Sequence, residues 1–115
     1  MNRQRYLNQL IRKKHNGLIK IITGIRRSGK SVILDQIRKE IETSGKRCLF
    51  LDFDIKQVRT QIPDADTLIA YVNEQLGEEK LYLFLDEVQN VKDWSEGVRT
   101  LRLYNTSVFI SGSII

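Results

Sequence analysis

A glycine-rich segment near the N-terminus carries residues that can bind phosphate. Residues 24–31 read Gly-Ile-Arg-Arg-Ser-Gly-Lys-Ser and match the pattern G-x-x-x-x-G-K-[ST] at every fixed position. Gly24 and Gly29 permit backbone angles that a Cβ would oppose, so the loop can turn its N–H groups inward around an anion. The helix expected after the loop adds unpaired N–H groups and its dipole. The segment therefore predicts a site for ATP or a closely related nucleotide.

The side chains of this segment are expected to divide the work. Lys30 would reach the β- and γ-phosphates as a catalytic group, and Ser31 would offer its hydroxyl to Mg²⁺, a hard cation that prefers oxygen ligands. The other cofactor-binding candidates are the remaining loop residues and the one after them: Gly24, Arg26, Arg27, Ser28, Gly29 and Val32. The two arginines would touch phosphate or the acidic side of the site, or point to solvent. A chance glycine turn before Lys-Ser is the alternative, and the flanking strand and helix disfavour it.

An acidic pair follows the most apolar stretch of the chain. Residues 81–85 read Leu-Tyr-Leu-Phe-Leu and are followed by Asp86 and Glu87. Ligands of open α/β sheets bind beyond the carboxyl ends of the strands, so both carboxylates are expected near Lys30. Asp86 would hold Mg²⁺ through water, and Glu87 would orient and deprotonate the attacking water. The alternative is a solvated acidic pair at the end of a strand. The pair suits water activation better than a small-molecule kinase, because the sequence offers no clear lid segment.

The elements that must position these residues alternate between strand and helix. This order predicts an α/β fold in which helices cover a parallel sheet. Apolar residues at helical spacing predict helices over residues 3–13, 32–41, 68–76 and 94–101, and apolar runs predict strands over 18–23, 48–53, 81–85 and 107–111.

Two connections carry local signals. Residues 54–65 contain Pro63-Asp64 and predict a connecting loop. Asp93 and Glu96 fit the capping pattern of a helix N-terminus. Trp94, at the start of that helix, is expected to pack the helix against the sheet rather than to stack on a base.

Composition points to one globular domain. The chain has 115 residues, of which 41% are hydrophobic and 29% charged. No apolar run is long enough to span a bilayer, the N-terminus lacks the apolar core of a secretory signal, and the lone Cys48 cannot form an internal disulfide. A cytoplasmic location without a membrane partner is the expectation that follows.

Charge is spread unevenly along the chain. Residues 1–47 hold 13 Lys/Arg and 3 Asp/Glu, whereas residues 48–115 hold 6 and 11, so the net charges are +10 and −5. The basic half contains the phosphate loop and the cluster Arg12-Lys13-Lys14-His15. This cluster predicts either a nucleic-acid contact or a solvated helix end with cations near the C-terminal dipole. Four residues make a weak patch, which favours the second interpretation.

Three segments together resemble the signatures of a prokaryotic group of AAA+-type ATPases. The first is Thr23-Gly24-Ile25-Arg26-Arg27-Ser28-Gly29-Lys30-Ser31, the second is Leu83-Phe84-Leu85-Asp86-Glu87-Val88-Gln89-Asn90-Val91 followed by Trp94, and the third is Val108-Phe109-Ile110-Ser111-Gly112-Ser113, similar to a motif written ITGS. The similarity runs along nearly the whole chain in the same order and with similar spacing.

The resemblance implies a three-layer P-loop NTPase fold with a five-stranded parallel sheet. Strand 107–111 would lie between the phosphate-loop strand and the strand of Asp86. Ser111 or Ser113 would present a polar sensor group to the γ-phosphate; a plain Ser-Gly-Ser turn is the alternative. Gln89 and Asn90 would shape the site. Many relatives carry an amide at the position that resembles Asp52, and a carboxylate there would repel Glu87 and alter its protonation.

The resemblance also implies a domain organisation and an activity. Residues 1–115 would form the N-terminal part of an ATPase domain, with a helical segment at 1–17 and a nucleotide-binding core at 18–115. The fold would be incomplete at the C-terminus, because family members continue into a fifth strand, a helical lid and a further domain. The expected function is Mg²⁺-dependent ATP hydrolysis coupled to a DNA or protein partner through that region. The alternatives are a nucleotide-binding module without appreciable turnover and an ATPase associated with DNA.

Overall fold

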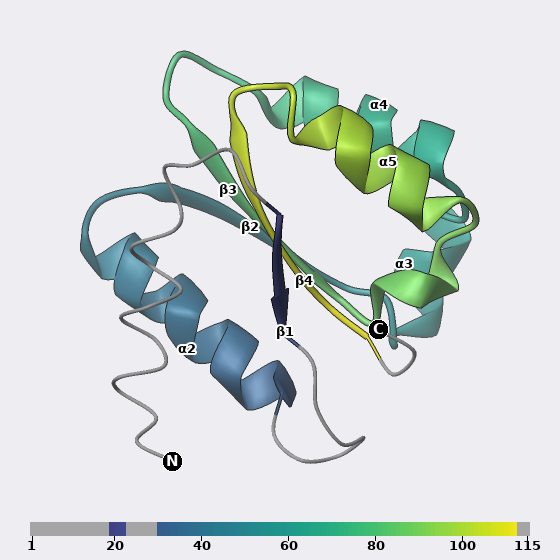
Figure 1. The fold of residues 1–115 in the computed structure, drawn as a ribbon, viewed down its shortest axis with the longest axis horizontal. Coiled ribbons are helices and arrows are strands. Elements are labelled where there is room, and N and C mark those ends of the chain that lie inside the picture. The colour runs from purple at the N-terminus through teal and green to yellow at the C-terminus, as the bar shows by residue number, and fades with distance from the viewer. Residues whose placement is uncertain (1–18, 23–29, 113–115) are drawn as a thin grey trace.

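Four parallel strands form the centre of the molecule. The computed structural model describes residues 19–22 and 30–112, with the side chains of Ile22, Lys30 and Ser31 excepted. The strands are β1 (Lys20–Ile22), β2 (Arg47–Asp52), β3 (Leu81–Asp86) and β4 (Thr106–Ser111), and their order in the sheet is β1-β4-β3-β2 (Figure 1). The strand of residues 106–111 thus separates the strand that precedes the phosphate loop from the strand of Asp86. This is the arrangement that the sequence predicted.

Helices cover the two faces of the sheet. The helix α2 (Lys30–Thr43) lies on one face, and α3 (Lys56–Gln61), α4 (Ala65–Gln75) and α5 (Trp94–Leu101) lie on the other (Figure 1). Two apolar clusters fill the space between these layers. The cluster under α2 contains Leu34, Ile37, Ile41, Tyr82, Phe84 and Phe109. The cluster on the opposite face contains residues of α4, α5 and all strands but β1, with Trp94 packed against it. The three-layer α/β fold is therefore confirmed.

Strand β3 lies inside the sheet between β4 and β2. All six of its residues are buried, and its side chains alternate between the two apolar clusters. Its register with β2 aligns Asp52 with Asp86, and its register with β4 aligns Leu85 with Ile110. The carboxyl ends of three strands consequently meet at one edge of the sheet.

The connection after β2 differs from the prediction of a loop over residues 54–65. Residues Lys56–Gln61 form the helix α3, and Ala65 already belongs to α4. The helix α3 has no buried residue, so it shows no apolar stripe in the sequence. The side chain of Arg59 instead fixes it to the end of β2, since Nη1 donates to the carbonyl oxygens of Phe53 at 3.1 Å and Asp54 at 2.8 Å.

The capping pattern predicted at Asp93 and Glu96 is also wrong. Asp93 precedes α5, but its backbone is left-handed (φ 59°, ψ 32°) and its side chain makes no capping hydrogen bond. The left-handed backbone turns the Asp93 side chain away from the first N–H groups of the helix. A side-chain cap occurs instead at α4, where Asp64 accepts a hydrogen bond of 2.9 Å from the N–H of Thr67.

No helix in the described ranges, 19–22 and 30–112, combines the length and the apolar character needed to cross a membrane.

Candidate active site

Asp86 and Ser111 meet at the carboxyl ends of β3 and β4. The Ser111 side chain is fully buried and Asp86 is 3% exposed. Ser111 Oγ donates a hydrogen bond of 2.6 Å to Asp86 Oδ1. This length is typical of a hydroxyl that donates to an ionised carboxylate. The parallel pairing of Leu85 with Ile110 places the two residues side by side one position later, so the sheet register creates this contact.

Glu87 leaves the strand through a left-handed turn. Its backbone has φ 54° and ψ 48°, and the short 3-10 helix η2 (Val88–Asn90) follows. This conformation costs roughly 1–2 kcal/mol for a residue with a Cβ. Gln89 Nε2 donates a hydrogen bond of 3.1 Å to Glu87 Oε2. The turn therefore gives the Glu87 carboxylate a hydrogen-bond donor from two residues later in the chain.

Asp52 adds a third carboxylate to this edge. It pairs with Asp86 across β2 and β3, and its Oδ1 accepts a hydrogen bond of 2.9 Å from the N–H of Asp54. Burial raises the pKa of Asp52, and the negative charges of Asp86, Asp54 and Glu87 raise it further, while the Asp54 N–H opposes the rise. The altered protonation of Glu87 that a carboxylate at this position implies stays a prediction.

Two further side chains, Asn90 of the turn after β3 and Arg59 of α3, donate to the backbone just after β2. Asn90 Nδ2 donates a hydrogen bond of 3.0 Å to the carbonyl oxygen of Phe53, the same oxygen that accepts from Arg59. Both donors hold the segment that follows Asp52 in place. Sequence reasoning did not find Arg59, because its role depends on α3, which has no apolar pattern.

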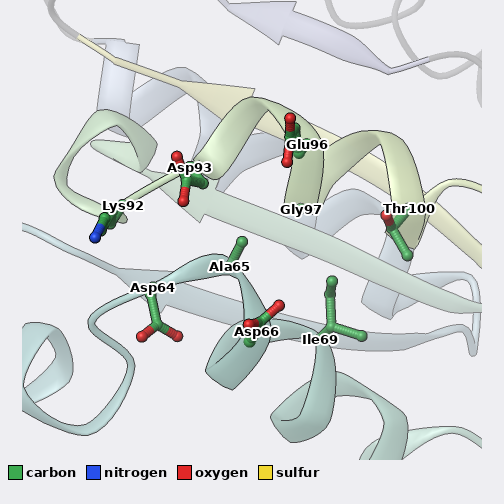
Figure 2. A pocket seen from close by; sticks show the side chains of 9 residues that line it. All are labelled: Asp64, Ala65, Asp66, Ile69, Lys92, Asp93, Glu96, Gly97 and Thr100. Atoms are coloured by element: carbon green, nitrogen blue, oxygen red, sulfur yellow. The ribbon is translucent and has the colours of Figure 1, made fainter.

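A separate acidic pocket lies between α4 and α5 and has a volume of about 340 Å³. Figure 2 shows the side chains that line it: Asp64, Ala65, Asp66, Ile69, Lys92, Asp93, Glu96, Gly97 and Thr100. The two helices approach closely beside it, since a Cβ on Gly97 would lie 3.0 Å from the Cβ of Ala65. None of the residues predicted to bind nucleotide or metal lines this pocket.

Comparisons with known proteins identify the family. A family model described as the AAA domain matches residues 16–114. The chain belongs to the AAA family. The fold agrees, because the structure of PCH-2 from C. elegans superimposes with a TM-score of 0.63 over 95% of this chain and 35% of that chain, at 10% sequence identity. The predicted assignment to the AAA+-type P-loop ATPases is thereby confirmed.

A curated relative matches nearly the whole chain. An uncharacterized protein of Haemophilus influenzae is 37% identical over 119 residues, which cover 98% of this chain and 30% of the relative. The AAA domain described here thus spans about a third of the length of the proteins it matches.

The predicted site residues fall into three groups in this AAA domain. Asp86, Glu87 and Ser111 lie together at the carboxyl ends of the strands. Lys30 and Ser31 begin α2, and Val32 lies in its first turn with 50% of its surface exposed. The remaining candidates lie outside the described residues: Gly24, Arg26, Arg27, Ser28, Gly29 and Ser113.

Asp86 is the residue of this edge that could hold a metal ion. The described part of the chain contains no group of three or more His, Cys, Asp or Glu side chains able to hold a metal. Magnesium in nucleotide sites keeps several waters and takes phosphate oxygens, so it needs only one or two carboxylates. Asp86, held by Ser111 at a strand end, is a fitting ligand of that kind.

Proposed function

We propose that this AAA domain binds ATP at residues 24–31 and hydrolyses it with Mg²⁺. The observation that carries the proposal is the contact of Ser111 with Asp86 beside Glu87, at the sheet edge beyond which ligands of α/β folds bind. Family membership supports a nucleotide as the ligand. Bound Mg²⁺ would neutralise charge on the β- and γ-phosphates.

Each residue has a proposed role. Lys30 contacts the phosphates, and Ser31 and Asp86 hold the cation, Asp86 through water. Glu87 accepts a proton from the attacking water and orients it. The hydroxyl of Ser111 is engaged with Asp86, so Ser111 acts on the cation site by fixing that carboxylate. Ser113 is therefore the serine that contacts the γ-phosphate directly in this proposal.

The test is ATP binding and turnover by the wild type, Lys30→Ala and Glu87→Gln. Lys30→Ala should weaken ATP binding, because it removes a cation that faces the phosphates. Glu87→Gln should bind ATP like the wild type but lose roughly 10²–10⁴ of its turnover, the usual contribution of a general base. Chelation of Mg²⁺ should abolish turnover in the wild type. Unchanged binding by Lys30→Ala would refute the assignment of the phosphate site, and full turnover by Glu87→Gln would refute the assignment of Glu87 as the general base.

The partner that hydrolysis moves stays a prediction, as does a cytoplasmic location. The basic cluster at residues 12–15, for which a DNA contact is the less favoured of the two interpretations, lies outside the described residues. DNA binding should be strongest at low salt if phosphate contacts carry it, so its absence there would exclude that partner.

A further inference from the structure

We propose that Gln89 is the positioning residue of Glu87. Its side-chain amide fixes the carboxylate in the orientation in which the other carboxylate oxygen receives the proton of the attacking water. This inference rests on the proposed function, in which Glu87 is the general base. It is carried by the hydrogen bond of 3.1 Å from Gln89 Nε2 to Glu87 Oε2.

The turn after β3 holds both residues in a fixed relation. The N–H of Asn90 donates to the carbonyl oxygen of Glu87 at 3.2 Å, and the N–H of Val91 donates to that of Val88 at 3.0 Å. Val88 is fully buried and anchors the turn in the apolar core. Gln89 is half-buried in this turn, so its side chain has a supported place from which to reach Glu87.

The chemistry of the two side chains fixes which end of the amide faces the base. An ionised carboxylate only accepts hydrogen bonds, and an amide donates through nitrogen and accepts through oxygen. Gln89 Nε2 must therefore face Glu87, and Oε1 must point away. Oε1 is buried and has no hydrogen-bond partner in the described structure. A buried acceptor without a donor is unfavourable, but the reversed amide would set its oxygen against a carboxylate.

Neighbouring polar side chains serve other acceptors. The amide of Asn90 donates to the carbonyl oxygen of Phe53, and the hydroxyl of Ser111 donates to Asp86. Asp52, the residue at the end of β2, is an acceptor when ionised. Among these side chains, Gln89 is thus the one whose amide donates to the carboxylate of Glu87.

A hydrogen bond on one oxygen of Glu87 sets the plane of the carboxylate. A general base works efficiently when it is held within hydrogen-bond reach of the water that it deprotonates. Removing the Gln89 donor takes away a hydrogen bond that sets this plane, which lowers the rate of the chemical step. Binding of ATP relies on other residues in the proposed site, so it should be unaffected.

The experiment compares Gln89→Met with the wild type in steady-state ATP hydrolysis. Methionine keeps the length of the side chain and removes the donor. We expect kcat to fall by roughly tenfold or more, a part of the effect of a general base, with KM and ATP affinity unchanged. Gln61→Met is the matched control, since Gln61 is exposed at the end of α3, and its kinetics should equal those of the wild type.

A double variant shows whether Gln89 acts through Glu87. Adding Gln89→Met to Glu87→Gln should cause no further loss, because residues that act as one unit are non-additive. A further loss of the same factor would overturn the positioning role, as would an unchanged or increased kcat in Gln89→Met. Should Gln89→Met fail to fold, Gln89→Glu keeps the length and polarity, replaces the donor by a carboxylate, and must lower kcat likewise. Full turnover in Glu87→Gln would instead refute the general base, which separates failure of the proposed function from failure of this inference.

Discussion

Replacing Lys20 by methionine should stabilise the domain near neutral pH. Lys20 lies in β1 and is 3% exposed. Its Nζ donates a hydrogen bond of 3.1 Å to Ser107 Oγ and lies 5.5 Å from the centre of the Phe109 ring. Burial and the nearby charge of Lys80 lower the pKa of Lys20 from 10.5 to about 8. The charged form of the Lys20 amine is therefore less stable in the folded protein than in the unfolded chain, where water surrounds it.

The size of the effect follows from the pKa. One pKa unit corresponds to about 1.4 kcal/mol, so the lowered pKa of Lys20 represents a penalty of roughly 3 kcal/mol on the charged form. The variant also loses the hydrogen bond to Ser107 and the contact with Phe109, about 1 kcal/mol each. A net gain of about 1 kcal/mol in the free energy of unfolding remains at pH 7.

The pH dependence gives a second, independent signature. Between pH 8 and pH 10.5 the unfolded chain binds the Lys20 proton and the folded chain releases it, so wild-type stability should rise with pH across this window. The penalty is full below pH 8 and absent above pH 10.5. The advantage of Lys20→Met should accordingly shrink above pH 8 and reverse at about pH 9, where the remaining penalty falls below the roughly 2 kcal/mol of lost contacts.

Denaturant unfolding at pH 7 and at pH 10 measures both effects. Lys46→Met is the matched control, because Lys46 is exposed in the turn before β2, and it should change stability by less than about 0.5 kcal/mol. A Lys20→Met variant that is less stable than the wild type at pH 7 would refute the reasoning. So would an advantage that is equal at both pH values.

Three more substitutions probe contacts around the sheet edge and the helix pair. Ser111→Ala removes the 2.6 Å hydrogen bond to Asp86 and should lower the free energy of unfolding by about 1.5–3 kcal/mol, which thermal unfolding measures. The same variant should need a higher Mg²⁺ concentration for turnover, which a metal titration measures. Gly97→Ala places a Cβ 3.0 Å from that of Ala65 and should destabilise by about 1–2 kcal/mol, and adding Ala65→Gly should restore part of the loss. Asp52→Asn keeps the acceptor for the Asp54 N–H but removes a carboxylate whose pKa is raised, so the variant should be more stable than the wild type at neutral pH. This gain should vanish below the ordinary pKa of 3.8, as unfolding measured in acid would show.

The strands were predictable because their sequence signals are local and strong. Each predicted strand lies within two residues of the observed one, as apolar runs bounded by turn residues define both ends. The position of residues 106–111 between β1 and β3 came from the family resemblance instead, since periodicity alone gives no strand order.

The helix α3 shows where pattern reasoning fails. Its stability does not come from an apolar stripe, because its one apolar residue, Val58, is only half-buried where it packs against the core. It comes partly from hydrogen bonds of Arg59 to two carbonyl oxygens at the end of β2. Such contacts depend on where the neighbouring strand ends in space, which no spacing of residues in the sequence encodes.

In the candidate site, likewise, the residues were predicted from the sequence but their contacts were not. Asp86 and Glu87 were predicted from the sequence because they follow an apolar run, and Ser111 was predicted from the family resemblance. Their partners were not found, since the contact between Ser111 and Asp86 requires the register of β3 with β4.

The left-handed backbone of Glu87 is another feature of the candidate site that the sequence pattern did not predict. Glycine or asparagine adopts this conformation most readily, so local preference disfavours glutamate there. In an extended strand, Glu87 and Gln89 would point to the same side but lie two residues, roughly 6.6 Å, apart. The left-handed turn brings their side chains within 3.1 Å. A glutamate retained at an unfavourable backbone position, with a donor brought to it by that same turn, is the arrangement expected where chemistry rather than stability selects the residue.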